Sequence, residues 1–281
     1  MLSVEELNKL STQVRRDIIR MVHAVQSGHP GGSLGCTDFL VALYNNILSH
    51  NNAPFSMSGE NEDVFFLSNG HISPAWYSVL ARCGYFPIEE LNSFRKLETR
   101  LQGHPTPATQ LPGIRIASGS LGQGLSVAIG CALGKKLSDD KHLVFSLHGD
   151  GELQEGQIWE AAMFAAAKNV DNLIATIDYN GKQIDGSLND VVSLGNLEAK
   201  WISFGWTVLK MDGNDIENIL KVMSEAKSEC FKGKPVVIIM STIMGKGVSF
   251  MENDHKWHGS PPNDEQKNIA LNELEETLGD Y

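Results

Sequence analysis

Apolar residues in the first part of the chain recur at steps of three and four, which is the spacing of one face of a helix. The series consists of Leu7, Leu10, Val14, Ile18, Met21 and Val25. It runs into Gly28, so we predict an amphipathic helix that ends at that turn. Further helices are predicted from Phe39 to Leu48 and, in a stretch rich in small residues, from Gly119 to Leu137. Val64 to Leu67 has the short apolar run of a buried strand.

Beyond this point the pattern alternates regularly between apolar runs and helical periods. Strands are predicted at Leu143 to Leu147, Leu173 to Ile177, Thr207 to Met211 and Val236 to Ser241. Helices are predicted near Gln157 to Lys168, Leu197 to Phe204 and Ile216 to Glu229. Strict alternation of this kind predicts βαβ units, hence an α/β fold with a doubly wound, mostly parallel sheet and helices on both faces. A polar, acidic helix is expected from Asp264 to Leu278.

Two regions, 50–62 and 103–118, are rich in Pro, Gly, Asn and Thr and are predicted to be long loops. Loops of this length inside a compact domain usually carry function. No repeat, low-complexity segment or linker divides the sequence. We therefore expect residues 1–281 to form one domain with long active-site loops and a C-terminal helix.

Composition narrows the choice of partners and compartment. The net charge of −11 argues against nucleic acid and anionic membrane surfaces as partners. The N-terminus is charged where a signal peptide needs an apolar run, and no stretch is long and apolar enough to span a bilayer. The cysteines lack CxxC spacing and suit reduced thiols in the cytoplasm better than disulfides or zinc ligands. They are Cys36, Cys83, Cys131 and Cys230.

The segment from Gly149 to Asn180 carries the most specific chemistry in the chain. Asp150 follows one predicted strand and Asn180 the next, so both should lie at the same edge of a parallel sheet. Their oxygens, with a backbone carbonyl just after Asn180, are ligands that Mg²⁺ or Ca²⁺ accepts. Gly149 and Gly151 allow a tight turn whose N–H groups can approach a phosphate. Gly-Asp-Gly alone is also a common turn; the full strand, turn, helix, strand, Asn order predicts a site for a diphosphate and a cation.

Four histidines lie in turns flanked by Gly or Pro: His29 in SGHPGG, His71 in SNGHISP, His104 in QGHPTP and His258 in WHGSPP. One such histidine is commonly a surface hydrogen-bonding residue. Four together favour a site for a hydroxylated, neutral-to-anionic substrate such as a sugar. A transition-metal site is the alternative, but no HxH or HxxxH spacing supports it.

The glycines from Gly119 to Gly124, in GSLGQG, are predicted to open a helix. Their order is GxxGxG and no convincing strand precedes them, so a dinucleotide fingerprint is not indicated. A loop that passes close to a flat cofactor ring explains the glycines; close packing of two helices is the alternative.

Taken in order, the motifs SGHPGGSLG, LSNGH, QGHP, GSLGQGLSVAIG, GDGELQEGQIWEA, Asn180 and WHGSP resemble the N-terminal part of a transketolase. The resemblance runs from about Gly28 to Pro262, and SGHPG distinguishes transketolases from related decarboxylase and dehydrogenase components. It implies a thiamine-diphosphate-binding fold of the diphosphate (PP) type, with Mg²⁺ or Ca²⁺ as the metal. It also implies transfer of a two-carbon ketol unit from a ketose, or its phosphate, to an aldose.

The resemblance also implies roles for single residues. Asp150, Asn180 and the carbonyl of Lys182 would hold the metal. The cofactor would be bound by His71, Gly119, Ser120, Leu121, Asp150, Gly151, Glu155, Asn180 and His258. The four histidines His29, His71, His104 and His258 would contact substrate hydroxyls and assist proton transfer. Glu155 resembles a glutamate that lies at a subunit interface, the alternative being a carboxylate favoured in the first turn of a helix. Arg95, Arg100 and Lys246 lie in or near the predicted loops. Each is expected to be a solvated charge, the alternative being contact with a substrate phosphate.

Full-length transketolases continue into a domain that binds the aminopyrimidine of the cofactor. This sequence has no second sheet after Pro262, so we expect the N-terminal subunit of a split transketolase that needs a C-terminal partner subunit, as α2β2. The alternatives are a component of another thiamine-diphosphate enzyme, of the dehydrogenase or deoxyxylulose-phosphate synthase kind, and a non-catalytic cofactor-binding module. A nicotinamide-binding domain would rest only on the α/β alternation and the glycines. The donor and acceptor sugars stay open.

Overall fold

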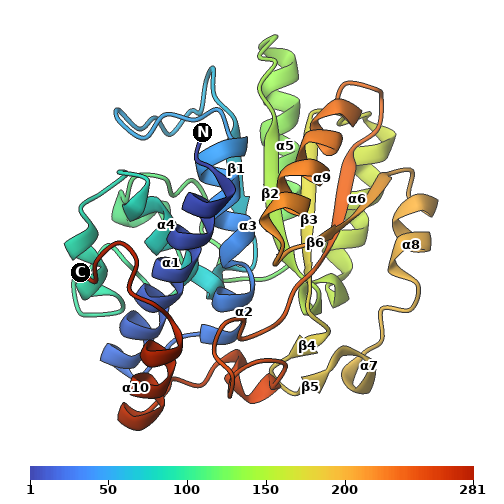
Figure 1. The fold of residues 1–281 in the computed structure, drawn as a ribbon. Coiled ribbons are helices and arrows are strands. Elements are labelled where there is room, and N and C mark those ends of the chain that lie inside the picture. Colours follow the sequence, from blue (N-terminus) through green and yellow to red (C-terminus); the bar gives the residue numbers. More distant parts are fainter.

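Five parallel strands form the central sheet of the computed structural model, which describes residues 1–281. The strands lie side by side in the order β1 (Val64–Leu67), β2 (Val144–Gly149), β3 (Leu173–Tyr179), β7 (Val236–Ser241), β6 (Thr207–Asp212) (Figure 1). Each pairing between neighbours in this sheet is parallel. The predicted α/β class and all five predicted strands are confirmed, with ends shifted by at most two residues.

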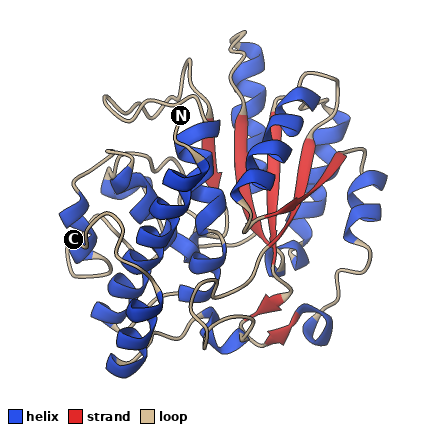
Figure 2. Cartoon of the chain, in the orientation of Figure 1, coloured by secondary structure: helices blue, strands red, loops and turns tan.

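Helices cover both faces of this sheet (Figure 2). Successive strand residues point to opposite faces, so Phe65 and Leu67 belong to one hydrophobic core and Val64 and Phe66 to the other. The first core is packed by α1 (Val4–Val25), α3 (Thr37–Ala42), α4 (Ser73–Arg82) and α9 (Ile216–Glu229). The second is packed by α5 (Gly124–Leu137), α6 (Gly156–Ala167) and α8 (Leu197–Ser203). Burial of both faces explains why the strands are almost continuously apolar.

The amphipathic helix predicted for the first part of the chain is α1. Ser3 caps it, with Glu6 completing a capping box, and the helix stops where Gln26 takes a left-handed conformation (φ 47°). Gly28 follows with φ 140°, where a Cβ atom would lie 2.9 Å from a methyl group of Val22. The turn that carries His29 therefore requires glycine.

Three predicted helices differ from the structure at their ends. Phe39–Leu48 is α3 followed by a π-helical turn, Leu43–Ile47. The helix predicted from Gly119 starts only at Gly124, because residues 119–123 form a loop in which Gly122 has φ 82°. The C-terminal helix, α10 (Asp264–Glu273), is shorter than predicted, and the tail beyond it returns to α1, where Asp280 bonds Arg16 at 2.8 Å.

Several short elements were not predicted. Region 50–62 contains no helix or strand, as expected, whereas region 103–118 contains one helical turn. The unpredicted elements are α2 (Pro30–Gly35), α4, α7 (Leu188–Val191), the hairpin of β4 (Lys182–Gln183) and β5 (Gly186–Ser187), and the 3-10 turns Gly70–Ile72, Ile88–Ser93, Pro107–Thr109, Gly151–Gln154 and His255–His258.

The cysteines are all unpaired, as expected. The structure contains no helix that is both long and apolar enough to span a membrane.

Candidate active site

The carboxyl ends of four neighbouring strands meet at one edge of the sheet. The register places Leu67 beside Leu147, Gly149 beside Asp178, and Asp178 beside Met240. The loops that leave these ends, together with the turn after α1 and the segment before α5, enclose a cavity of about 360 Å³. Ligands of open α/β sheets bind outside the carboxyl ends of the strands, so the position is the expected one.

Most of the residues singled out in the sequence line this one cavity. They are His29, His71, His104, Gly119, Leu121, Asp150, Gly151, Glu155, Asn180, Lys182 and His258. Ser120 does not line it, although both of its neighbours in the sequence do. Sequence reasoning missed several polar or flexible residues of the lining: Asn69, Ser118, Glu152, Gln154, Asp178, Gln183 and Met244.

The four histidines form one cluster although they come from four separate turns. The ring centroid of His29 lies 5.2 Å from that of His71, 6.4 Å from that of His104 and 5.5 Å from that of His258. Burial, with the charges of His258, Arg95 and His104, lowers the pKa of His29 to about 4. The pKa values of His71, His104 and His258 are also lowered, mainly by burial. All four rings are therefore neutral near pH 7, and each has one nitrogen that donates and one that accepts.

Arg95 is not the solvated charge predicted from the sequence. It is half-buried, its Nη1 donates to Ser27 Oγ at 2.8 Å, and no carboxylate pairs with it. A Cβ atom on Gly103 would lie 2.6 Å from the guanidinium, so Arg95 fills the space between the turns that carry His29 and His104. Arg100 pairs with Glu90 at 2.7 Å and Lys246 lies 3.8 Å from Glu252, both partly exposed, as expected for surface charges.

Two buried carboxylates lie at the ends of β2 and β3. Asp150 accepts hydrogen bonds from the N–H groups of Gly151 (2.7 Å) and Gly181 (2.6 Å). Burial and the charge of Asp178 raise the pKa of Asp150 to about 8. Asp178 accepts from Asn180 Nδ2 at 2.9 Å and from the hydroxyl of Thr242. No lysine or arginine pairs with Asp150 or Asp178. A bound cation would therefore supply the positive charge that these two carboxylates lack in the protein.

The same edge of the cavity carries an oxygen-rich donor set for such a cation. The carboxylate of Asp150, the carboxamide of Asn180 and the carbonyl of Lys182 match the ligands that Mg²⁺ prefers. Because Asn180 Nδ2 donates to Asp178, the carboxamide oxygen Oδ1 is the atom of Asn180 that can bind a cation. Its hydrogen-bond partner in the protein is the N–H of Lys182, at 2.9 Å. These residues fit a divalent cation.

The cavity wall also contains buried polar atoms that have no partner in the protein. They are His29 Nδ1, Asn69 Oδ1, Ser118 Oγ and His258 Nδ1. A buried polar atom without a hydrogen bond is costly, so these atoms indicate a ligand with many hydrogen-bonding groups. A cofactor diphosphate with its attached rings, together with a polyhydroxylated substrate, fits this chemistry.

The helix α6 starts at Gly156, within one residue of the predicted start. The Gly149–Gly151 turn differs from its predicted form in two respects. An unpredicted 3-10 turn, Gly151–Gln154, lies between the Gly149–Gly151 turn and the helix. The N–H of Gly149 donates to Glu152 at 3.0 Å and that of Gly151 to Asp150, so neither is free as expected. Glu155 occupies the N-cap position of α6 at the exposed rim of the cavity, consistent with the alternative of a favourable helix-end carboxylate.

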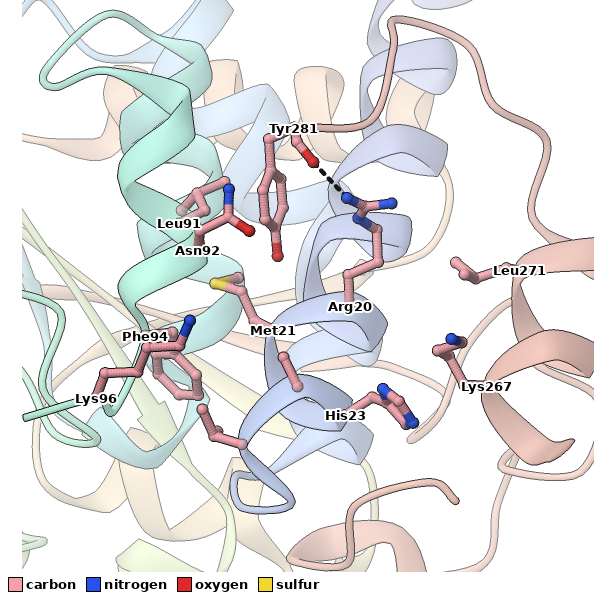
Figure 3. Close-up of a pocket in the computed structure, with 12 residues that line it drawn as sticks. Arg20, Met21, His23, Leu91, Asn92, Phe94, Lys96, Lys267, Leu271 and Tyr281 are labelled. Atoms are coloured by element: carbon pink, nitrogen blue, oxygen red, sulfur yellow. Dashed lines mark hydrogen bonds between the residues drawn. The ribbon is translucent and has the colours of Figure 1, made fainter. Parts of the chain in front are cut away.

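A second cavity, of about 260 Å³, lies between α1, the turn Ile88–Ser93 and α10 (Figure 3). Its arginine and histidine already have partners, since Arg20 bonds Asp280 at 2.9 Å and His23 bonds Asp264 at 2.8 Å. None of the residues predicted for the site lines it. It is therefore separate from the candidate active site.

Comparison with known proteins adds three findings. Residues 8–278 match the family described as "Transketolase, thiamine diphosphate binding domain". The 6-deoxy-6-sulfo-D-fructose transketolase subunit SqwG of Clostridium sp. (strain MSTE9) is 38% identical over 96% of this chain and 96% of its own length. An apulose-4-phosphate transketolase subunit of Actinobacillus succinogenes is 36% identical over 98% of both chains.

A solved structure of transketolase from Campylobacter jejuni superposes with a TM-score of 0.88 at 33% identity. The match covers 97% of this chain but only 43% of that one. The chain thus spans less than half of the solved transketolase and nearly the whole length of the two subunits.

Proposed function

Because the chain belongs to the family of transketolase thiamine-diphosphate-binding domains, we propose that it is the cofactor-binding subunit of a two-subunit transketolase. The observation that carries the proposal is one cavity that joins the histidine cluster to the Asp150, Asn180 and Lys182 oxygens. The similarity to two proteins named as transketolase subunits, over 96% or more of their lengths, supports the two-subunit form. We propose that residues 1–281 act as one cofactor-binding unit. The cytoplasmic location suggested by the sequence stays a prediction.

Thiamine diphosphate, when bound, supplies the electron sink that lets the bond next to a ketose carbonyl break. The metal would be held by Asp150, Asn180 and the carbonyl of Lys182, and it would offset the diphosphate charge beside the acidic end of the sheet. The neutral rings of His29, His71, His104 and His258 would donate to and accept from the sugar hydroxyls. A neutral imidazole can also take a proton from one hydroxyl and return it to another, which transfer of a ketol unit requires.

We propose an anionic ketose as the donor substrate. The two relatives are named for a sulfonated sugar and for a sugar phosphate, so both names describe anionic sugars. In this chain, Arg95 supplies a positive charge without a carboxylate partner next to His29 and His104.

We propose that the partner subunit supplies the pyrimidine-binding domain and that the assembly is α2β2. The outer surface of α5 and α6 supports a protein contact, because Val127, Met163 and Phe164 are 41%, 59% and 46% exposed there. Gly130 and Gly134 of α5 have no atom within 4 Å of an added Cβ, so a neighbouring chain could pack close to the helix backbone. An apolar surface of this kind on a soluble α/β layer is typical of a subunit interface.

The proposal is tested by co-expressing the chain with its candidate partner and measuring ketol transfer from xylulose 5-phosphate to ribose 5-phosphate with thiamine diphosphate and Mg²⁺. We expect activity only with both chains and its loss in Asp150→Ala. Asp139→Asn, which changes an exposed aspartate, is the control and should keep full activity.

Full turnover by the purified chain alone would refute the two-subunit proposal. Cofactor binding without transfer to any of a panel of phosphorylated and sulfonated sugars would instead favour a non-catalytic module. Condensation of pyruvate with an aldose phosphate by the same preparation would move the assignment to the synthase alternative.

A further inference from the structure

Glu152 is a buried carboxylate whose partners are nearly all neutral. Its side chain is 1% exposed, and it accepts hydrogen bonds from the N–H of Gly149 at 3.0 Å and the N–H of Gly122 at 2.8 Å. The hydroxyl of Ser68 donates to it as well. The one nearby ionisable group is His148, at 3.8 Å. Two backbone N–H groups and one hydroxyl therefore donate hydrogen bonds to this carboxylate, and no lysine or arginine pairs with it.

The three donors belong to three separate segments of the cavity wall. Ser68 lies at the end of β1 and in turn accepts from the N–H of Gly124 at 3.1 Å. Gly122 lies in the loop that brings Gly119 and Leu121 to the cavity. Gly149 opens the turn that contains Asp150. One side chain therefore joins the glycine-rich loop, the end of β1 and the metal-site turn.

We infer that Glu152 is a positioning residue that holds the loop 119–124 and the Gly149–Gly151 turn in the arrangement that binds the cofactor, before the cofactor is present. The inference rests on the proposed function, because that function makes these two segments the cofactor site. No lysine or arginine holds them together, so the arrangement depends on the two acceptor oxygens of this carboxylate.

Glutamine is the informative replacement because it has the same shape. Oε1 accepts from Gly122 and Oε2 from Gly149, and both donors are backbone N–H groups that cannot turn around. In either orientation the glutamine amide would point an N–H group at one of these donors. At least one of the two segments is then released from the bridge.

The test measures the dissociation constant for thiamine diphosphate in the presence of Mg²⁺, by calorimetry on the complex with the partner subunit. For Glu152→Gln we expect this dissociation constant to increase about tenfold or more, because at least one charge-assisted hydrogen bond is lost. At saturating cofactor, kcat should stay within about twofold of the parent. In the isolated, ligand-free chain, amide hydrogen exchange of residues 119–124 should become faster.

Glu62→Gln is the matched control. Glu62 is also a buried carboxylate, 2% exposed, and accepts from the N–H of Asn51 at 2.7 Å and from Arg115, but it does not line the cavity. This variant should lower the melting temperature without changing the affinity for thiamine diphosphate. A Glu152→Gln variant that loses stability in the same way yet binds the cofactor like the parent would overturn the inference.

Ser68→Ala provides a second variant if Glu152→Gln does not fold. It removes the hydroxyl that bridges Glu152 and Gly124 but keeps the carboxylate and both of its backbone bonds. We expect faster exchange at Gly124 and a smaller loss of affinity, about threefold; unchanged exchange and affinity would again contradict the inference. If the parent complex itself does not bind thiamine diphosphate, the proposed function fails, and that outcome is separate from any effect of the variants.

Discussion

At the scale of single residues, the site combines neutral histidines with an unpaired cation. His29 and His104 lie in turns that are far apart in the sequence, and Arg95 contacts both turns through Ser27 and Gly103. Its charge adds to burial in lowering the pKa of both histidines. The rings can then act as hydrogen-bond donors and acceptors for a sugar. Arg95 thus both contacts the turns that carry His29 and His104 and lowers the pKa of the two rings.

Arg95→Gln should therefore raise the pKa of His29 and of His104. A unit charge a few ångströms away in a partly solvated site changes a pKa by about half a unit to one unit, so we expect shifts of that size. The measurement is an NMR titration of the histidine ring protons in the ligand-free chain. Arg100→Gln, which breaks a surface pair with Glu90, is the control and should move neither value. Equal titration curves for Arg95→Gln and the parent would show that the charge of Arg95 does not reach the rings.

The scale of helices and strands shows why α5 and α6 differ from α1 and α9. The two latter helices have one polar face, whereas α5 and α6 are apolar on the side that faces away from the sheet as well. A cavity of about 480 Å³ between them is lined by Ile129, Leu133 and Phe164 among others. A helix that is apolar all round is normally buried, so these two are expected to be buried in the assembled enzyme.

Phe164→Glu should weaken the association with the partner subunits and leave the isolated chain folded, because the side chain is 46% exposed there. Loss of a central aromatic contact raises the dissociation constant of a protein complex by about thirtyfold or more. Analytical ultracentrifugation of the mixed subunits measures the effect. The control, Ile269→Glu, replaces an exposed apolar residue by Glu on α10, at the opposite side of the molecule from α5 and α6 in Figure 1. An intact complex with Phe164→Glu would place the interface elsewhere.

At the scale of the whole molecule, the fold buries two carboxyl groups, those of Asp150 and Asp178, where the strands end. Asp178 is fully buried, and burial raises its pKa above the value that it has in the unfolded chain. Its stabilising effect is complete below the unfolded pKa and is lost as the pH rises through the folded pKa. In the ligand-free chain near pH 8, Asp178 therefore opposes folding. A bound cation would stabilise the ionised carboxylates of Asp178 and Asp150. The buried carboxyl group that lowers the stability of the ligand-free chain thus lies where the proposed metal and cofactor bind.

Asp178→Asn should accordingly make the ligand-free chain more stable, and more so at pH 8 than at pH 5. Its partners, Thr242 and Asn180, can reorient to satisfy an amide. We expect a melting temperature higher by about 4 °C at pH 8, the shift that about 1–2 kcal/mol produces in a chain of this size. Addition of Mg²⁺ and thiamine diphosphate should stabilise the parent more than the variant. Asp139→Asn, at an exposed turn, is the control, and a variant less stable than the parent at pH 8 would contradict the argument.

Local sequence patterns were sufficient to establish the fold class and the chemistry available to the site. Apolar runs and helical periods are local patterns, so the five strands and the helices α1, α6, α8 and α9 followed from them. The glycine and proline turns are local as well, and they marked the histidines and Asp150. The motifs also sufficed to recognise the family, because their residue types and order carry the resemblance.

Which charges are buried, and what they contact, depends on the tertiary structure. Glu152 looks like a surface glutamate in the first turn after Gly149, yet its partners Ser68 and Gly122 are 84 and 30 residues away. Arg95 depends in the same way on Ser27, 68 residues away, and the first N–H of α5, that of Gly124, donates to Ser68, 56 residues away. Burial and hydrogen bonding are set by distant segments that the sheet brings together, and no local pattern contains that information.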